Sequence, residues 1–225
     1  MSEIQYLNIQ DLKDEQAQLC ELLAQCVQDG ASLDFLAEES KSHYDEYWSA
    51  VAKDIQKHKT FLWVALQSGE VVGTVQLVRA TKANALRRTE IEKLMVHPKA
   101  RQKGIAHQLF TLAEDQAKHL NLKLLVFDTR TGDVSEKLYE KFNFIKAGII
   151  PQFALSHTGT IDSTTLFYKL LVEVETDGYF RPKLLHRCRS FSLKVLLINS
   201  FREFFRTFNS FRIAICEVGR LTTCE

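Results

Sequence analysis

The segment from Val96 to Ala106, which reads VHPKARQKGIA, is the feature that most constrains the fold of this chain. An apolar strand is predicted before it, over residues 90–96, and an amphipathic helix after it, over residues 104–119. The first N–H groups of a helix have no acceptor within the helix, and they lie at the positive end of its dipole. Because Gly104 stands where the helix begins and the loop before it is basic, the segment predicts a strand–loop–helix unit that binds a phosphate.

Hydrophobic patterns along the rest of the chain predict an α/β domain. The predicted strands cover residues 5–9, 60–66, 71–78, 90–96, 123–127, 144–150 and 164–171, and the predicted helices cover 11–28, 42–58, 104–119 and 133–142. Asp133 is predicted to cap the last of these helices, and Glu136 three residues later has the spacing of a capping box. Together the patterns indicate a mixed sheet flanked by helices, with a strand–helix–strand crossover around Gly104.

Composition excludes several classes of protein. The chain has 225 residues, of which 45% are hydrophobic and 25% charged, and its net charge of +1 gives no electrostatic ground for a nucleic-acid partner. Its five cysteines show no metal-ligand spacing, so we expect reduced thiols and no metal site. The first residues lack a basic segment followed by an apolar run, so we expect no signal peptide and a cytoplasmic location.

The pattern of the domain ends at Leu171, and the composition changes after it. Leucines and phenylalanines between residues 193 and 211 fall at helical spacing beside lysines and arginines, which predicts a basic amphipathic helix. Three interpretations stay open, in this order. The segment is a helix packed on the domain or across a homodimer, or it is no part of the native design, for instance the product of an extended or altered reading frame, or it contacts a membrane surface. We therefore divide the chain into a domain over residues 1–171 and an extension over residues 172–225.

Three ionisable side chains near the phosphate unit are candidates for acid–base chemistry. Glu92 is either an ordinary polar residue of its strand or a proton acceptor that faces a cleft. Asp128 follows a buried strand, at the edge where α/β sheets gather ligands, and it is either a ligand-facing group or a turn residue. Tyr139 lies beside the buried face of its helix and is either a packing residue or a proton donor, since a phenol stays protonated at neutral pH.

Several of these segments resemble motifs of the GNAT superfamily of N-acetyltransferases. Arg101, Gly104 and Ala106 occupy the fixed positions of its Arg/Gln-x-x-Gly-x-Gly/Ala loop. The segment LYEKFNF, which begins at Leu138, is similar to its Leu-Tyr-x-x-x-Gly-Phe motif, with Asn143 in place of the glycine. The segments DTRTGD, IIPQFA and TLFYK are similar to the subgroup that includes tabtoxin-resistance acetyltransferase, and the resemblance covers residues 4–171.

The resemblance implies a GNAT fold, with a mixed sheet of about six to seven strands, and a specific reaction. That reaction is transfer of acetyl from acetyl-CoA to a primary amine of a small molecule, by direct attack in a ternary complex. For the subgroup, the transfer detoxifies an amine-bearing antimetabolite. The alternative is a non-catalytic acyl-CoA-binding module of the same fold.

The resemblance also implies roles for particular residues. It implies Glu92 and Asp128 as bases and Tyr139 as the acid that protonates the departing thiolate. The coenzyme contacts that it implies are Met95, Val96, Arg101, Gln102, Lys103, Gly104, Ile105, Ala106 and Ser135.

Overall fold

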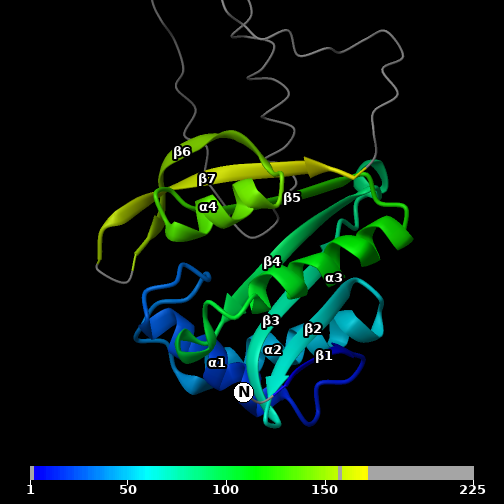
Figure 1. Ribbon diagram of the computed structural model, residues 1–225. Coiled ribbons are helices and arrows are strands. Elements are labelled where there is room, and N and C mark those ends of the chain that lie inside the picture. The colour runs from blue at the N-terminus through cyan, green and yellow to red at the C-terminus, as the bar shows by residue number, and fades with distance from the viewer. Residues whose placement is uncertain (1–2, 157–158, 172–225) are drawn as a thin grey trace, which may run out of the picture. The chain divides into compact units, whose positions relative to one another are not determined.

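The computed structural model describes residues 3–156 and 159–171 (Figure 1). The strands are β1 (Ile4–Ile9), β2 (Thr60–Gln67), β3 (Glu70–Arg79), β4 (Arg88–Val96), β5 (Leu124–Arg130), β6 (Ile145–Leu155) and β7 (Ile161–Leu170). The helices are α1 (Gln16–Gln28), α2 (Lys41–Gln56), α3 (Ile105–His119) and α4 (Val134–Lys141), with short 3-10 turns at Ala83–Ala85 and Pro98–Ala100. The amphipathic helix predicted within residues 172–225 lies outside the described residues.

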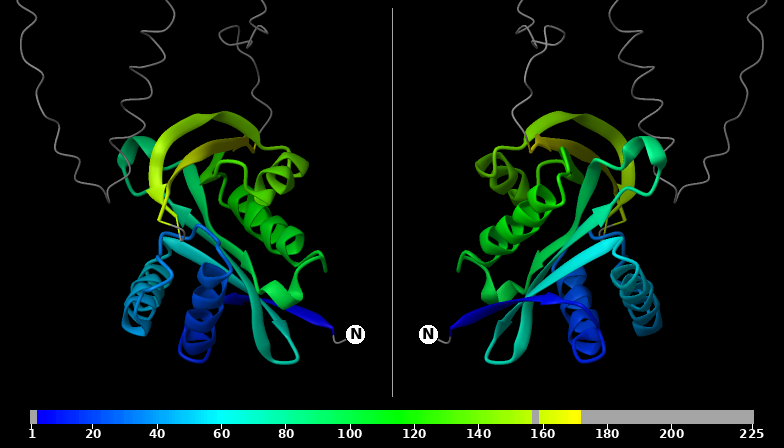
Figure 2. Two further views of the ribbon diagram at one scale, coloured as in Figure 1. Left: turned by 90° about the vertical axis from the view of Figure 1, so that its left-hand side faces the viewer. Right: turned by 90° about the vertical axis from the view of Figure 1, so that its right-hand side faces the viewer.

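The described strands form one seven-stranded sheet in the order β1-β2-β3-β4-β5-β7-β6. All neighbours are antiparallel except β4 and β5, which are parallel and are joined by the crossover through α3. The predicted mixed sheet and its crossover are thereby confirmed. Figure 2 shows α1 and α2 against one side of the sheet and α3 and α4 against the other, and we call these sides the α1–α2 face and the α3–α4 face.

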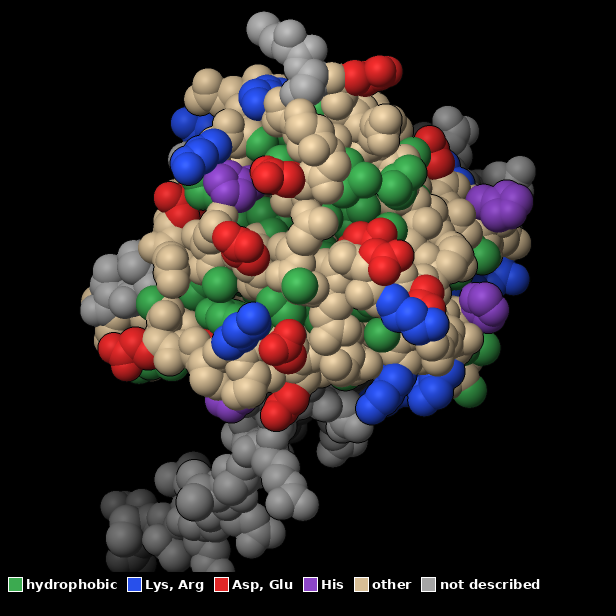
Figure 3. All heavy atoms as spheres, turned by 90° about the horizontal axis from the view of Figure 1, so that it is seen from below, with side chains coloured by type: hydrophobic (Ala, Val, Ile, Leu, Met, Phe, Trp, Pro, Cys, Tyr) green, Lys and Arg blue, Asp and Glu red, His purple; other side chains and the backbone are tan. Residues whose placement is uncertain are grey.

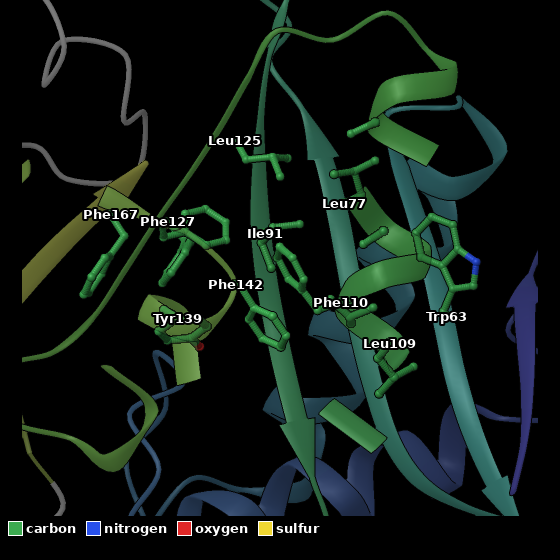
Figure 4. Close-up of a cluster of buried hydrophobic side chains, with 14 of the residues drawn as sticks. Trp63, Leu77, Ile91, Leu109, Phe110, Leu125, Phe127, Tyr139, Phe142 and Phe167 are labelled. Atoms are coloured by element: carbon green, nitrogen blue, oxygen red, sulfur yellow. The ribbon is translucent and has the colours of Figure 1, made fainter. Parts of the chain in front are cut away.

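The core consists of two clusters, one on each face of the sheet. In β2, Leu62 and Val64 join the cluster beneath α1 and α2, whereas Trp63 and Ala65 join the one beneath α3. A strand that is buried on both faces needs apolar residues at consecutive positions, which explains the continuous run in this part of the sequence. Figure 4 shows the cluster of the α3–α4 face, in which Phe110 stacks on Phe142 with ring centroids 4.3 Å apart.

Two element bounds differ from the prediction for local reasons. Helix α1 begins at Gln16 instead of residue 11, because residues 13–15 form a turn and the Asp11 carboxylate before it accepts from the Lys13 N–H at 3.3 Å. The prediction ended the next-to-last strand at residue 150, but β6 continues through Pro151 to Leu155. Because β6 is an edge strand, the missing N–H of a proline costs little there, and the strand is irregular between Ile150 and Ala154.

The start of α4 confirms one half of the predicted capping box. Asp133 is the N-cap, and its carboxylate accepts from the Ser135 N–H at 3.0 Å. The second half was wrong, because the Glu136 carboxylate accepts from the Thr165 hydroxyl of β7 at 2.6 Å. A donor on the neighbouring sheet, which sequence spacing does not show, takes the carboxylate away from the helix.

Candidate active site

The sheet splits between its two parallel strands. β4 pairs with β5 only from Arg88 to Glu90, and the two strands diverge beyond that point (Figure 1). On its other side β4 stays paired with β3 as far as Val96. Within the described part of the chain, no strand pairs with the β5 side of β4 over residues 91–96. This edge is where an extended ligand can bind in the manner of an added strand.

A bulge in β4 sets which side chains face the split. It lies at Lys93, which has a φ of 48°, and the pairing with β3 shifts there. Ile91, before the bulge, joins the cluster of the α3–α4 face, whereas Met95, after it, joins the cluster of the α1–α2 face. Glu92 and Lys93, adjacent in sequence, therefore both face α1 and α2, although strict alternation would separate them.

Three carboxylates influence one another on this face, where the strands part. Burial raises the pKa of Glu92 and also that of Asp128. Burial raises the pKa of Glu90 to about 8, and the negative charges of Glu92 and Asp128 add to the effect. The Thr164 hydroxyl donates to Asp128 at 2.6 Å and so fixes that side chain against β7. Carboxylates whose pKa is raised toward neutrality by burial suit general-base work.

Tyr139 lies on the opposite face of the sheet, on α4. Its ring packs between aromatic side chains, with the centroid of Phe127 at 4.1 Å and that of Phe167 at 5.9 Å. In Figure 4 its oxygen points away from Phe167, toward the strand that carries Ile91. Burial raises the pKa of Tyr139 well above its ordinary value, so the phenol stays protonated. Among the described residues its hydroxyl makes no hydrogen bond, which leaves the proton available to a ligand.

The backbone at the start of α3 has the form that the sequence predicted for a phosphate site. Gly104 is the N-cap with a φ of 78°, and Gln102 also has a positive φ of 63°. The first N–H of α3 that bonds within the helix belongs to Gln108, which donates to the Gly104 carbonyl at 3.1 Å. No atom lies within 4 Å of the position that a Cβ on Gly104 would take. The N–H groups of the first turn thus lack a helix acceptor and the space beside Gly104 is open, which fits a pyrophosphate group.

The basic side chains of this loop bind within the protein. Arg101 forms an ion pair with Asp29 at 2.6 Å, and its Nε donates to the Val96 carbonyl at 3.3 Å. Lys103 donates to the Gln67 side chain at 3.1 Å. Arg101 thus fastens the loop to the end of α1 and to β4. The direct donors to an anion are then the backbone N–H groups of the loop. The basic side chains contribute a positive electrostatic potential.

Two positions beside the loop complete the site. Ser135 lies in the first turn of α4, and its hydroxyl lies 3.0 Å from that of Thr129 in β5. Gly73 in β3 lies under the start of α3, where an added Cβ would stand 3.0 Å from Ile105 and 3.1 Å from Leu109. Gly73 therefore lets the helix approach the sheet closely. A glycine inside a predicted strand is the signal that could have identified it.

Several other aromatic and cysteine side chains have structural roles. Trp48, Tyr44 and Trp63 are buried core residues, whereas Tyr47 accepts a hydrogen bond from Gln76 at 2.9 Å beneath the split. Cys20 and Cys26 are buried free thiols, and burial raises their pKa values to about 12 and about 11, which is unsuited to a nucleophilic thiolate. Sequence reasoning missed Glu90, because alternation alone gives no sign of how deeply a strand carboxylate is buried.

The face drawn in Figure 3 shows no dominant charge, because acidic, basic and hydrophobic side chains are intermixed on it. A separate hollow of about 460 Å³ lies between β1, β2 and α3, and its walls include Phe61, Trp63 and His119. None of the candidate site residues lines it. No helix within the described ranges is long and apolar enough to cross a membrane.

Comparison with known proteins gives one family and one fold. A model described as the acetyltransferase (GNAT) family matches residues 20–144. An N-acetyltransferase from Staphylococcus aureus Mu50 superposes with a TM-score of 0.64 at 18% identity, over 75% of this chain and 99% of its own. A putative acetyltransferase from Salmonella typhimurium, solved with its cofactor acetyl-CoA, gives 0.62 at 16% identity, over 81% and 99%. A spermidine N-acetyltransferase from Vibrio cholerae, solved with CoA and spermine, gives 0.61 at 18%, over 75% and 95%.

Proposed function

The chain belongs to the acetyltransferase (GNAT) family and has its fold, and from that premise we propose that it transfers acetyl from acetyl-CoA to a primary amine of a small molecule. The transfer is direct: the amine nitrogen bonds to the acetyl carbon as the carbon–sulfur bond breaks. One proton leaves the amine and one proton reaches the CoA sulfur. The proposal needs a base on the side of the amine and an acid on the side of the thiol.

The observation that carries the proposal is the placement of these groups on opposite faces of the split. Glu92 and Asp128 face α1 and α2, whereas Tyr139 lies on the α3–α4 face. The start of α3, with its unbonded N–H groups, is on the same face as Tyr139. A coenzyme bound at α3 has its sulfur beside the acid, and an acceptor that enters from the other face meets the bases. The unpaired edge of β4 offers N–H donors to the carbonyl oxygen as its charge grows.

The pKa shifts of the three ionisable groups agree in direction with their proposed roles. The Tyr139 phenol is protonated at neutral pH because burial raises its pKa, so it can donate to a thiolate. Burial raises the pKa values of Glu92 and Asp128, which makes each carboxylate a stronger acceptor for the proton of an amine. Ser135 lies at the start of α4, near the proposed path of the coenzyme arm. Detoxification of an amine-bearing compound follows only if such a compound is the acceptor.

The first test is calorimetric titration of the full chain with acetyl-CoA. The double variant Arg101→Ala/Gly104→Glu keeps the core but loses the loop anchor and fills the space at the helix start. We expect wild type to bind and the double variant, folded by circular dichroism, to bind at least about tenfold more weakly. Equal binding by the two proteins, or none by wild type, would overturn the coenzyme site.

The second test measures thiol release with a panel of amines and peptides. The expected acceptors are small primary amines, and transfer only to peptide N-termini would contradict the proposed acceptor class. The double variant Glu92→Gln/Asp128→Asn is expected to bind acetyl-CoA as wild type does and to transfer at least about 100-fold more slowly. A wild type that binds acetyl-CoA and acetylates nothing would instead support the non-catalytic acyl-CoA-binding module.

A further inference from the structure

Lys93 is a buried cation that the proposed reaction does not use. Only 4% of its side chain is exposed, and its Nζ lies 2.6 Å from the Asp34 carboxylate. Asp34 belongs to the segment between α1 and α2, residues 29–40, and 87% of its side chain is exposed. A surface segment thus contacts a buried ammonium on β4, the strand that also carries Glu92. Burial of an ammonium is costly unless a partner compensates it.

Aromatic side chains complete the surroundings of this ammonium. The Nζ of Lys93 lies 5.3 Å from the ring centroid of Tyr47 and 5.9 Å from that of Phe35. Phe35 follows Asp34 in the same segment and packs on Tyr47, with ring centroids 5.4 Å apart. Lys93 therefore holds the segment at two consecutive residues, by an ion pair and by a cation–π contact. The positive φ at Lys93 is the local strain that brings its side chain to this face.

The charges around Lys93 are almost all negative. The titratable and charged groups that face this place are Glu90, Glu92 and Arg88 from β4, Asp128 from β5, Asp34 from the segment and Tyr47 from α2. Burial raises the pKa values of Glu92 and Asp128, and the charge of Lys93 lowers both of them in part. The charge of Asp34 acts in the opposite direction on both carboxyls.

We propose that Lys93 is a positioning residue for acetyl transfer: it fastens segment 29–40 to the acceptor side of the split and supplies the positive charge that Glu92 and Asp128 share. The inference rests on the proposed function for its catalytic half, whereas the fastening half stands on the contacts alone. The fastening role and the charge role predict different effects of substitutions at Lys93 and Asp34. Loss of fastening affects Lys93 and Asp34 variants alike, but loss of charge affects them in opposite directions.

The charge role is tested by the pH dependence of kcat/KM in the full chain. Lys93→Met keeps the side-chain stem and removes the charge, so the bases become harder to ionise and the acid limb moves to higher pH by about 0.5–1 unit. Asp34→Asn removes a negative charge, so the limb moves to lower pH. Lys93→Arg keeps the limb near its wild-type position. Shifts of both charge-removing variants in one direction, or of neither, overturn the charge role.

The fastening role is tested by hydrogen exchange of residues 29–40, which needs no turnover. Lys93→Met and Asp34→Asn are each expected to speed exchange there by at least about threefold. The matched control is Lys169→Met, since Lys169 pairs with Glu114 at 2.7 Å and lies over the rings of Phe110 and Phe144 on the other face. It is expected to leave both the exchange of residues 29–40 and the acid limb unchanged.

The two experiments separate the inference from the function on which it rests. Unchanged exchange of residues 29–40 in both variants overturns the fastening role, whatever the activity of the protein. If wild type transfers no acetyl group but both variants show faster exchange of residues 29–40, the proposed function is rejected and the fastening role is supported. Asp34→Asn alters an exposed side chain, so it tests the ion pair even where Lys93→Met does not fold.

Discussion

At the scale of single residues, Tyr139 combines two properties that usually exclude each other. It lies within an aromatic cluster, yet its hydroxyl makes no hydrogen bond to any described residue. The hydroxyl oxygen is not among the fully buried polar atoms that lack a partner, so it is accessible to water or to a ligand. Retention of the hydroxyl at such a place is understandable if a ligand uses it, which is the role we propose for it.

The variant Tyr139→Phe tests that role. It removes only the hydroxyl, so we expect unfolding free energy to stay within about 1 kcal/mol of wild type or to rise. We expect kcat to fall by about 100-fold, because the thiolate then leaves without a proton, while acetyl-CoA affinity is retained. Urea unfolding, titration with acetyl-CoA and steady-state kinetics give the three values. A fall in affinity as large as the fall in kcat would show that Tyr139 only shapes the site.

Glu90 predicts a pH dependence of stability. Its pKa is about 8 in the folded protein and near the ordinary 4.5 in the unfolded chain, so the neutral carboxyl is favoured by folding. The stability it contributes is complete below about pH 4.5 and is lost as the pH rises through about 8. Glu90→Gln cannot ionise and should therefore be more stable than wild type by about 1–4 kcal/mol at alkaline pH, with no gain in acid.

Urea unfolding of Glu90→Gln between pH 5 and 9 measures this difference. The matched control is Glu70→Gln, because Glu70 lies in β3 and is exposed. We expect the control to change stability by less than about 0.5 kcal/mol at every pH. A gain for Glu90→Gln that is independent of pH would mean that its carboxyl is well hydrated in the folded protein.

At the scale of elements, the site depends on how closely α3 approaches the sheet. Gly73→Ala would place a Cβ 3.0 Å from Ile105, 3.1 Å from Leu109 and 3.2 Å from the Met95 carbonyl. We expect the start of α3 to move away from β3 by a few tenths of an ångström, at a cost of about 1–3 kcal/mol in stability. We expect acetyl-CoA affinity to fall by about tenfold, since the N–H donors of α3 and the free edge of β4 no longer match one ligand.

Gly148→Ala is the matched control for this prediction. Gly148 lies in the edge strand β6, with no atom within 4 Å of the position of a Cβ. We expect its affinity for acetyl-CoA and its stability to stay near those of wild type. If Gly73→Ala loses stability but binds acetyl-CoA as wild type does, the close approach of α3 to the sheet matters for core packing and not for coenzyme binding.

At the scale of the whole molecule, local signals in the sequence predicted the order of the helices and strands. They did not predict on which face of the sheet each side chain lies. The order of strands and helices follows from periodicity, and the Asp133 cap follows from residue type. The side on which Lys93 lies depends on a bulge that forms only when β4 pairs with β3, so alternation misplaces it. The opposition of Glu92 and Tyr139 likewise needs the split between β4 and β5, which is a property of the assembled sheet.

The same reasoning predicts how much of the chain the coenzyme site needs. Every element that carries a candidate residue, from β4 to α4, lies within the compact unit Met1–Val174. A chain truncated after Val174 should therefore bind acetyl-CoA within about twofold of the full chain, because the donors at the start of α3 and the edge of β4 are all retained. Calorimetric titration of both chains, with circular dichroism to verify folding, checks this. A folded truncated chain whose affinity falls tenfold or more would mean that residues 175–225 contribute to coenzyme binding, and it would argue against the altered reading frame.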